Sequence, residues 1–217
     1  MLDSRGQLEE LMSMFVRVDP DSAAEHRRSG VDPNVDTRAS AKHAAVAITL
    51  VRDDDQRLCF LLTRRAAGMR AHPGQFALPG GRIDGAESPA ETALRELHEE
   101  LGVLLEASAV LGSLDDYVTR SGYRITPIVA WAADQPTELL PNSDEVAIVY
   151  RVPVTELASA PNFLSIPESS DPVIQLPMLD TMVHAPTAAV LFQFAELALR
   201  HRVTRVLHLE QPVFAWR

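Results

Sequence analysis

The 217-residue chain contains a single cysteine, Cys59, so it can form no internal disulfide and no cysteine-based zinc site. Cys59 lies in an apolar run that is typical of a strand, where its simplest role is that of a small buried residue. A lone cysteine of this kind is typical of a reducing compartment. We therefore expect a cytoplasmic protein without a disulfide framework.

Long apolar runs are also missing. None approaches the roughly 20 residues that a helix needs to cross a bilayer, and residues 2–10 are too polar and acidic for a secretory signal. The chain has no internal repeat, no low-complexity segment and no Gly-x-Ser-x-Gly elbow, which argues against a serine hydrolase built on that elbow. These absences favour a soluble, intracellular domain of another class.

Basic residues are outnumbered, because 20 Lys and Arg stand against 30 Asp and Glu, for a formal net charge of −10. General nucleic-acid binding needs a basic surface, so this balance argues against it. A small anionic substrate is compatible with the balance, since local arginines or a bound metal ion can reverse the field inside a cleft.

Apolar runs separated by turn residues predict one mixed α/β domain with terminal additions. The expected strands cover residues 44–51, 58–63, 110–117, 123–131 and 145–152, with a short extended piece at 76–78. The expected helices cover residues 4–18, 88–101 and 188–201, with a helical turn at 155–158. We expect residues 1–40 to form an N-terminal helix and a surface connection, and residues 41–217 to form the domain with its C-terminal extension.

The helix at residues 88–101 has the clearest boundary signals. Ser88 suits the N-cap, Pro89 suits the first helical position, and Glu91 completes a capping box. Gly102 supplies the stop at the C-terminal end.

Three carboxylates share one side of this helix, because Glu96, Glu99 and Glu100 are spaced three and four residues apart. Two like charges about 4 Å apart repel by roughly 4 kcal/mol at an effective dielectric constant near 20. Arg95 screens part of this repulsion, and a hard divalent cation, Mg²⁺ or Mn²⁺, would screen more of it. By spacing alone, a solvated acidic face explains the cluster equally well.

The segment before the helix decides between these two interpretations. Gly81 is followed by five residues and Glu87, then by seven residues and Arg-Glu-Leu-His-Glu-Glu-Leu-Gly-Val at residues 95–103. This arrangement resembles the Nudix box, which has Gly, Glu and Arg-Glu-aliphatic-x-Glu-Glu-x-Gly-aliphatic at the same spacings. Its seven fixed identities would agree by chance on the order of once in a billion starting positions.

Resemblance to the Nudix hydrolases implies an α/β/α sandwich with a mixed β-sheet. It also implies hydrolysis of a nucleoside diphosphate linked to another group, X. By the same resemblance, Glu96, Glu99, Glu100 and the backbone carbonyl of Gly80 would hold Mg²⁺ or Mn²⁺. Such an ion neutralises diphosphate oxygens and activates an attacking water.

Further roles follow from this resemblance. Glu87 and Arg95 would brace the loop and the helix, and Glu96 could orient or deprotonate the water. The glutamate that acts as the base differs within the family, so that assignment stays open. Glu145, at the start of the strand at 145–152, is a candidate extra base or ligand. A surface acid at a strand start is an equal alternative.

The segment at residues 61–81 resembles the signature that precedes the box in the coenzyme A pyrophosphatase branch of the family. The matching positions are Leu61, Leu62, Thr63, Arg65, Ala66, Arg70, Gly74, Pro79, Gly80 and Gly81. Leu78 departs from the signature, because that branch has Phe there. Residues 114–127, with Leu-Asp-Asp-Tyr and a later Ser-Gly, also look like that branch.

Coenzyme A carries a diphosphate and a 3′-phosphate, and planar guanidinium groups suit phosphate oxygens. Arg65 and Arg70, together with Gly80 and Gly81, are therefore the expected substrate contacts. The alternative role of the two arginines is to pin the loop through carbonyl groups or acids.

Three functions are thus open. The first is hydrolysis of coenzyme A or its thioesters to 3′,5′-ADP and 4′-phosphopantetheine. The second keeps the catalytic helix but acts on ADP-ribose, a dinucleotide or an oxidised nucleotide, and the third is a non-catalytic nucleotide sensor, for which a broken box would be expected. The helix at 188–201 could complete the sandwich, line the pocket or form a homodimer interface.

Overall fold

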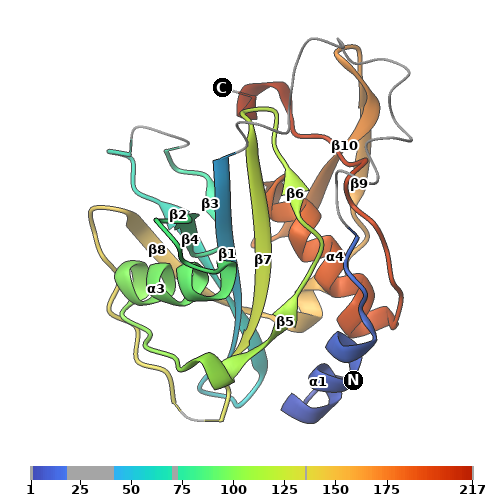
Figure 1. The fold of residues 1–217 in the computed structure, drawn as a ribbon. Coiled ribbons are helices and arrows are strands. Elements are labelled where there is room, and N and C mark those ends of the chain that lie inside the picture. Colours follow the sequence, from blue (N-terminus) through green and yellow to red (C-terminus); the bar gives the residue numbers. More distant parts are fainter. Residues whose placement is uncertain (1, 19–41, 70–72, 135, 217) are drawn as a thin grey trace.

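A mixed β-sheet occupies the centre of the molecule (Figure 1). The computed structural model describes residues 2–18, 42–69, 73–134 and 136–216. The strands of this sheet are β1 (Lys42–Arg52), β2 (Leu58–Arg65), β3 (Phe76–Ala77), β4 (Gly80–Arg82), β5 (Val110–Ser113), β6 (Tyr117–Val118), β7 (Tyr123–Trp131) and β8 (Val146–Pro153). Their order is β3–β2–β1–β7–β5, with β4 paired to β1, β6 to β7 and β8 to β2.

Strand β1 connects the two halves of this sheet. One of its edges pairs in parallel with β7 from Lys42 to Leu50. Its other edge pairs in antiparallel fashion with β4 at residues 44–46 and with β2 at residues 50–52. The mixed sheet confirms the predicted α/β class, and the β1–β2 hairpin was predicted as well.

Helices cover both faces of the sheet. They are α1 (Arg5–Met14), α3 (Pro89–Leu101) and α4 (Thr187–Arg200). The chain also forms three short 3₁₀ helices, η1 (Ala107–Ala109), η2 (Val154–Ala158) and η3 (Val213–Ala215). Ala45 and Ala47 of β1 pack with Ala93 of α3, whereas Ile48 and Leu50 join the core beneath α1 and α4. The molecule is thus an α/β/α sandwich, as the family resemblance implied.

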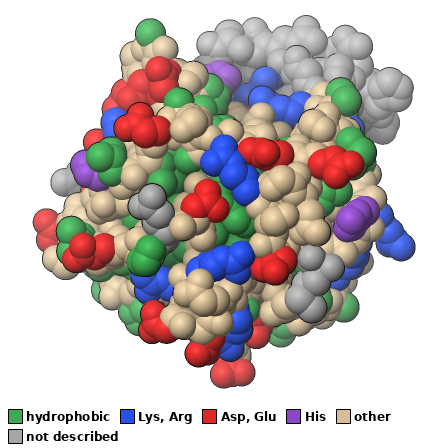
Figure 2. Space-filling view, turned by 90° about the horizontal axis from the view of Figure 1, so that it is seen from below, with side chains coloured by type: hydrophobic (Ala, Val, Ile, Leu, Met, Phe, Trp, Pro, Cys, Tyr) green, Lys and Arg blue, Asp and Glu red, His purple; other side chains and the backbone are tan. Residues whose placement is uncertain are grey.

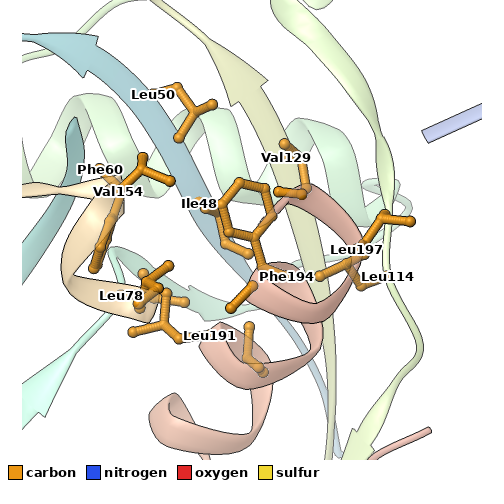
Figure 3. Close-up of a cluster of buried hydrophobic side chains, with 14 of the residues drawn as sticks. Ile48, Leu50, Phe60, Leu78, Leu114, Val129, Val154, Leu191, Phe194 and Leu197 are labelled. Carbon is orange, nitrogen blue, oxygen red and sulfur yellow. The ribbon is translucent and has the colours of Figure 1, made fainter. Parts of the chain in front are cut away.

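The largest hydrophobic cluster lies between the sheet and α4 (Figure 3). Phe194 and Leu191 of α4 and Phe60 of β2 are fully buried in it. Leu78, which departs from the coenzyme A branch signature, belongs to the same cluster and is only 4% exposed. The departure therefore falls in the core.

The proline-rich region after residue 160, for which the sequence predicted no strands, forms a second sheet. Its strands are β9 (Asn162–Ile166), β10 (Ser169–Met178) and β11 (Thr181–His184), antiparallel in the order β11–β10–β9. The sheet packs beside α4, where the rings of Phe163 and Phe192 meet edge to face with centroids 5.9 Å apart.

Most predicted elements are confirmed with shifted ends. The single strand predicted at 110–117 is wrong, because it divides into β5 and β6, and strand β4 was not predicted. Helix α1 ends at Met14 rather than at residue 18. Helix α4 is buried along most of its length, which confirms that it completes the sandwich. The connection predicted at 19–40 lies outside the described residues.

None of the helices in the described part of the chain is long and apolar enough to cross a membrane. The division into residues 1–40 and 41–217 stays a prediction.

The buried ring of Phe194 predicts a large loss of stability on truncation. We expect Phe194→Ala to lower the free energy of unfolding by about 3–5 kcal/mol, because it removes transfer energy and leaves a cavity. Phe214→Ala is the matched control, since that ring is 57% exposed. Urea unfolding measures both variants, and equal losses would contradict the placement of Phe194 in the core.

Candidate active site

Strand β4 is pressed between β1 and α3. Gly80 and Gly81 pair with Val46 and Ala45 of β1. A Cβ added at Gly81 would lie 2.2 Å from Oε1 of Glu96, and one added at Gly80 would lie 2.3 Å from the carbonyl oxygen of Ala45. Gly80 has no room for a side chain because the added carbon would meet the β1 backbone, whereas at Gly81 it would meet the flexible end of Glu96. The backbone of β4 can therefore approach the carboxylates of α3.

Helix α3 carries the capping predicted for it. The Ser88 hydroxyl accepts a hydrogen bond from the Glu91 N–H at 3.3 Å, and the Glu91 carboxylate accepts one from the Ser88 N–H at 2.7 Å. Gly102 ends the helix in the left-handed conformation, with φ of 71°. Burial of Ala93 and Leu97 against the sheet then fixes which side of the helix faces β4.

Arg95 connects this helix to the loop before it. Its Nε donates to Glu87 at 2.8 Å, and its Nη1 donates to Glu96 at 2.9 Å and to Glu99 at 3.0 Å. Its Nη2 donates to the carbonyl oxygen of Arg82 at 3.2 Å. One guanidinium thus joins three acids and the main chain of β4, and the hydrogen bonds, above all that to Glu87, raise the Arg95 pKa.

Glu87 is held from two sides. Besides Arg95, the Thr92 hydroxyl donates to its carboxylate at 2.8 Å. The Arg95 guanidinium, and then the Thr92 hydroxyl, lower the pKa of Glu87 to about 2. Glu87 therefore stays ionised and ties the loop to α3 across neutral pH. No role was expected for Thr92, whose only signal in the sequence is its position one turn after the N-cap.

Within this cluster, Glu100 is buried and Glu96 is partly buried, with a side chain 15% exposed, whereas Glu99 is exposed. Glu100 is 4% exposed, and burial, followed by the nearby Glu96 charge, raises its pKa to about 8. Arg65 and the Gly80 N–H lower the Glu100 pKa, but by less than burial raises it. Burial also raises the pKa of Glu96, against the opposing effect of Arg95.

Arg65 and Glu145 lie beside these carboxylates. Arg65 ends β2, where it pairs with Val146 of β8, and the Ala66 N–H donates to the Glu145 carbonyl at 2.8 Å. The Glu145 charge raises the pKa of both Glu96 and Glu100. The charges of both residues thus act on the carboxylates of α3. Arg70 lies outside the described residues.

The three candidate metal ligands are not equally placed. Within the described ranges, no group of three or more His, Cys, Asp or Glu side chains is arranged as a metal site. Glu99 is 56% exposed and turned to Arg95, while Glu96 and Glu100 lie against β4. Glu96 and Glu100, whose pKa values are raised by burial, nevertheless offer carboxylate oxygens beside β4. Such donors suit Mg²⁺ or Mn²⁺.

The two glycines of β4 predict different effects of an added methyl group. Gly81→Ala meets only the flexible end of Glu96, so we expect stability within about 1 kcal/mol of wild type and weaker Mn²⁺ binding. Gly80→Ala meets the β1 backbone, and a loss above about 2 kcal/mol is expected. Gly68→Ala, with nothing within 4 Å, is the control. Thermal unfolding and Mn²⁺ titration measure these effects, and unchanged Mn²⁺ affinity in Gly81→Ala would contradict the role of Glu96.

The buried Glu100 carboxyl predicts pH-dependent stability of the metal-free protein. Its pKa is about 8 in the folded chain, above its ordinary value of 4.5. Between these values the folded state binds more protons than the unfolded state, so the free energy of unfolding falls as pH rises. We expect the stability of wild type relative to Glu100→Gln to fall from about pH 5 to about pH 8. Urea unfolding in EDTA tests this, and parallel pH profiles would contradict it.

Comparison with known proteins places this site in a family. Residues 41–175 match the family model described as the NUDIX domain. Nudix hydrolase 3 of Caenorhabditis elegans is 38% identical over 138 residues, which are 62% of this chain and 55% of that protein. An uncharacterized Nudix hydrolase, NudL, of Yersinia enterocolitica is 42% identical over 119 residues, 54% of this chain and 60% of that protein. The matches span less than two thirds of either relative.

Solved structures of lower identity are similar over more of the chain. The Nudix hydrolase RenU of M. smegmatis has a TM-score of 0.49 at 22% identity, over 75% of this chain and 92% of that one. A Nudix hydrolase of Alicyclobacillus acidocaldarius has a TM-score of 0.49 at 20% identity, over 74% and 92%. Because the family model covers more than half of the chain and includes the whole glycine–glutamate–arginine cluster, the chain belongs to the Nudix family.

Proposed function

We propose that this chain is a metal-dependent hydrolase that cleaves a nucleoside diphosphate linked to X, with coenzyme A or its thioesters as substrate. The observation that carries the proposal is the cluster on α3, where Glu96 and Glu100 lie against β4. Arg95 donates hydrogen bonds to the acids of this cluster and of the loop before it. The products would be 3′,5′-ADP and 4′-phosphopantetheine or its acyl form.

A divalent ion, Mg²⁺ or Mn²⁺, held by Glu96, Glu99, Glu100 and the Gly80 carbonyl would supply charge neutralisation and water activation. The protein's own groups do the remainder. Glu96 and Glu100, whose pKa values are raised by burial, accept a proton from water more readily than ordinary carboxylates. The base is one of these two or Glu145, and the choice stays open.

Positioning falls to the groups around them. Arg95 and Glu87 fix the loop relative to α3, so the ligands keep their spacing when the charge on the site changes. Arg65, on the side of Glu100, can bind diphosphate oxygens, and its guanidinium suits them geometrically. Gly80 and Gly81 let the substrate reach the carboxylates, because no side chain stands between.

Arg65 is also the reason to favour coenzyme A. It belongs to the signature at residues 61–81, and it lies beside the carboxylates rather than on a remote loop. The other segment that resembles that branch, residues 114–127, contributes to packing. The Asp115 carboxylate accepts hydrogen bonds from Gln193 and Arg205, and the Tyr117 hydroxyl donates to the Leu209 carbonyl at 2.9 Å. The coenzyme A proposal therefore rests on the upstream segment alone.

Hydrolysis of ADP-ribose, a dinucleotide or an oxidised nucleotide keeps the same carboxylates and is the second candidate. A non-catalytic sensor is the third, and the intact box argues against it. A cytoplasmic location and a homodimer stay part of the proposal; Cys59, free and buried, fits a reducing compartment.

Turnover of a panel of diphosphates tests the proposal. We expect release of 3′,5′-ADP from coenzyme A with Mg²⁺ or Mn²⁺, and a fall of roughly a hundredfold or more in kcat/KM in Glu99→Gln, because a ligand is lost. Glu106→Gln, at an exposed acid beyond α3, is the control expected to keep activity. The panel also contains ADP-ribose, NADH, diadenosine polyphosphates and 8-oxo-dGTP.

Two outcomes would contradict different parts of the proposal. Preference for ADP-ribose would remove coenzyme A as the substrate and leave the hydrolase intact. Metal binding without turnover of any diphosphate would remove the hydrolase and favour the sensor.

A further inference from the structure

Two cations meet on one aromatic ring at the end of the central sheet. Lys42 Nζ lies 5.4 Å from the centroid of the Tyr123 ring, and the guanidinium carbon of Arg82 lies 5.5 Å from it. Strand register explains the meeting, because Lys42 is paired with Tyr123, and Arg82 with Ala44. Side chains two residues apart on a strand share a face, so all three project to the same side.

Neither cation has an acidic partner in the described part of the chain. The side chain of Arg82 donates its Nε–H to the Tyr123 hydroxyl at 2.8 Å, and the Lys42 ammonium lies over the ring of the same tyrosine. Elsewhere arginines lie beside acids, as Arg57 does with Asp53. Figure 2 shows the same mixture of acidic and basic side chains on the face seen from below. In a chain of net charge −10, two neighbouring cations with no acidic partner among the described residues are unusual.

The three polar groups suit a phosphate. The Tyr123 hydroxyl accepts from Arg82, which leaves its own proton free to donate to an anion. The other guanidinium N–H groups and the Lys42 ammonium supply further donors, and both cations are exposed. A dianionic phosphate would relieve the repulsion between the two cations and satisfy all three groups at once.

Arg82 connects this group to the carboxylates. It directly follows Gly81, whose backbone contacts Glu96, and its carbonyl oxygen accepts from Arg95. Its side chain, by contrast, leaves for the opposite face of β4. A diphosphate at Glu96 and a second phosphate near Arg82 would thus lie at consecutive residues but on opposite faces of β4, so one ligand has to pass around the end of the sheet to contact both.

We propose that Lys42, Arg82 and Tyr123 form a subsite that binds a phosphomonoester on the nucleotide, separate from the diphosphate that is cleaved. This inference rests on the proposed function, because it assigns a specificity element to the same substrate. It predicts that nucleotides with an additional ribose phosphate are preferred to those that lack it.

Lys42 is the only lysine in the chain, so its amine can be observed alone beside the N-terminal amine. Reductive ¹³C-methylation keeps its charge and gives an NMR signal that is titrated with 3′,5′-ADP and with 5′-AMP at equal Mg²⁺. We expect 3′,5′-ADP to shift this signal and to bind about tenfold more tightly than 5′-AMP, because charged hydrogen bonds are added. Equal affinities, with no shift, would overturn the subsite.

Variants separate binding from a structural role. Arg82→Gln, Tyr123→Phe and Lys42→Gln are each expected to reduce the affinity difference between the two nucleotides, whereas Lys42→Arg keeps it. Arg202→Gln, at an exposed arginine after α4, is the charge-matched control and should retain the full difference. Thermal unfolding of every variant identifies loss of fold, and loss of stability with an unchanged affinity difference would show that the three residues only fix the sheet end.

Turnover distinguishes this proposal from the one on which it rests. We expect kcat/KM for coenzyme A over dephospho-coenzyme A to exceed unity and to fall about tenfold in Arg82→Gln. Equal turnover of both substrates by wild type would overturn the subsite and leave the hydrolase standing. Turnover of neither, with the nucleotide affinity difference present, would overturn the hydrolase and support the subsite.

Discussion

The close approach of β4 to β1 on one side and to α3 on the other is the constraint on which the site depends. Glycine at 80 and 81 leaves no side chain in either gap, and the small residues Ala45, Ala47 and Ala93 let α3 lie near the sheet. A larger residue at Gly80 would meet the β1 backbone and displace the strand, whereas one at Gly81 would displace the Glu96 carboxylate. The Nudix box is therefore a packing motif as well as a set of candidate metal ligands, because its glycine makes the approach of its glutamates possible.

That approach brings acids together that would otherwise repel. Arg95 compensates Glu87, Glu96 and Glu99 from a single guanidinium, and Glu87 is stabilised as an anion. Glu100 is different, because burial keeps it partly protonated near neutral pH. Ionisation of the Glu100 carboxyl in the folded chain is therefore unfavourable unless a cation lies beside it. If Glu100 binds the metal ion as proposed, metal affinity and the stability of the metal-free protein are opposed at this residue, which is common where a fold keeps a charged site in its interior.

Local signals predicted the parts of this structure that local forces decide. The capping of α3, from Ser88 to Gly102, involves neighbours in sequence, and its boundaries were predicted closely. The hairpin of β1 and β2 was equally clear. Strand β4 was missed for two reasons. Its pairing partner, residues 44–46 of β1, lies 34 to 38 residues earlier in the chain, and its two glycines have low strand propensity. The sheet of β9 to β11 was missed because prolines interrupt the alternation of apolar and polar residues. In addition, only the face of the sheet that packs against α4 is apolar.

The site shows the same division between local and distant information. Spacing placed Glu96, Glu99 and Glu100 on one side of a helix, but not how deeply each is buried, and burial separates Glu100 from Glu99. Arg65 and Lys42 come together with the box only through strand register, which no short motif contains. Strand β4 joins these contributions, because Gly81 contacts the carboxylates on one face and Arg82 reaches Tyr123 on the other. If the proposed subsite is correct, substrate choice depends on side chains at the ends of the strands beside the box rather than on the box itself.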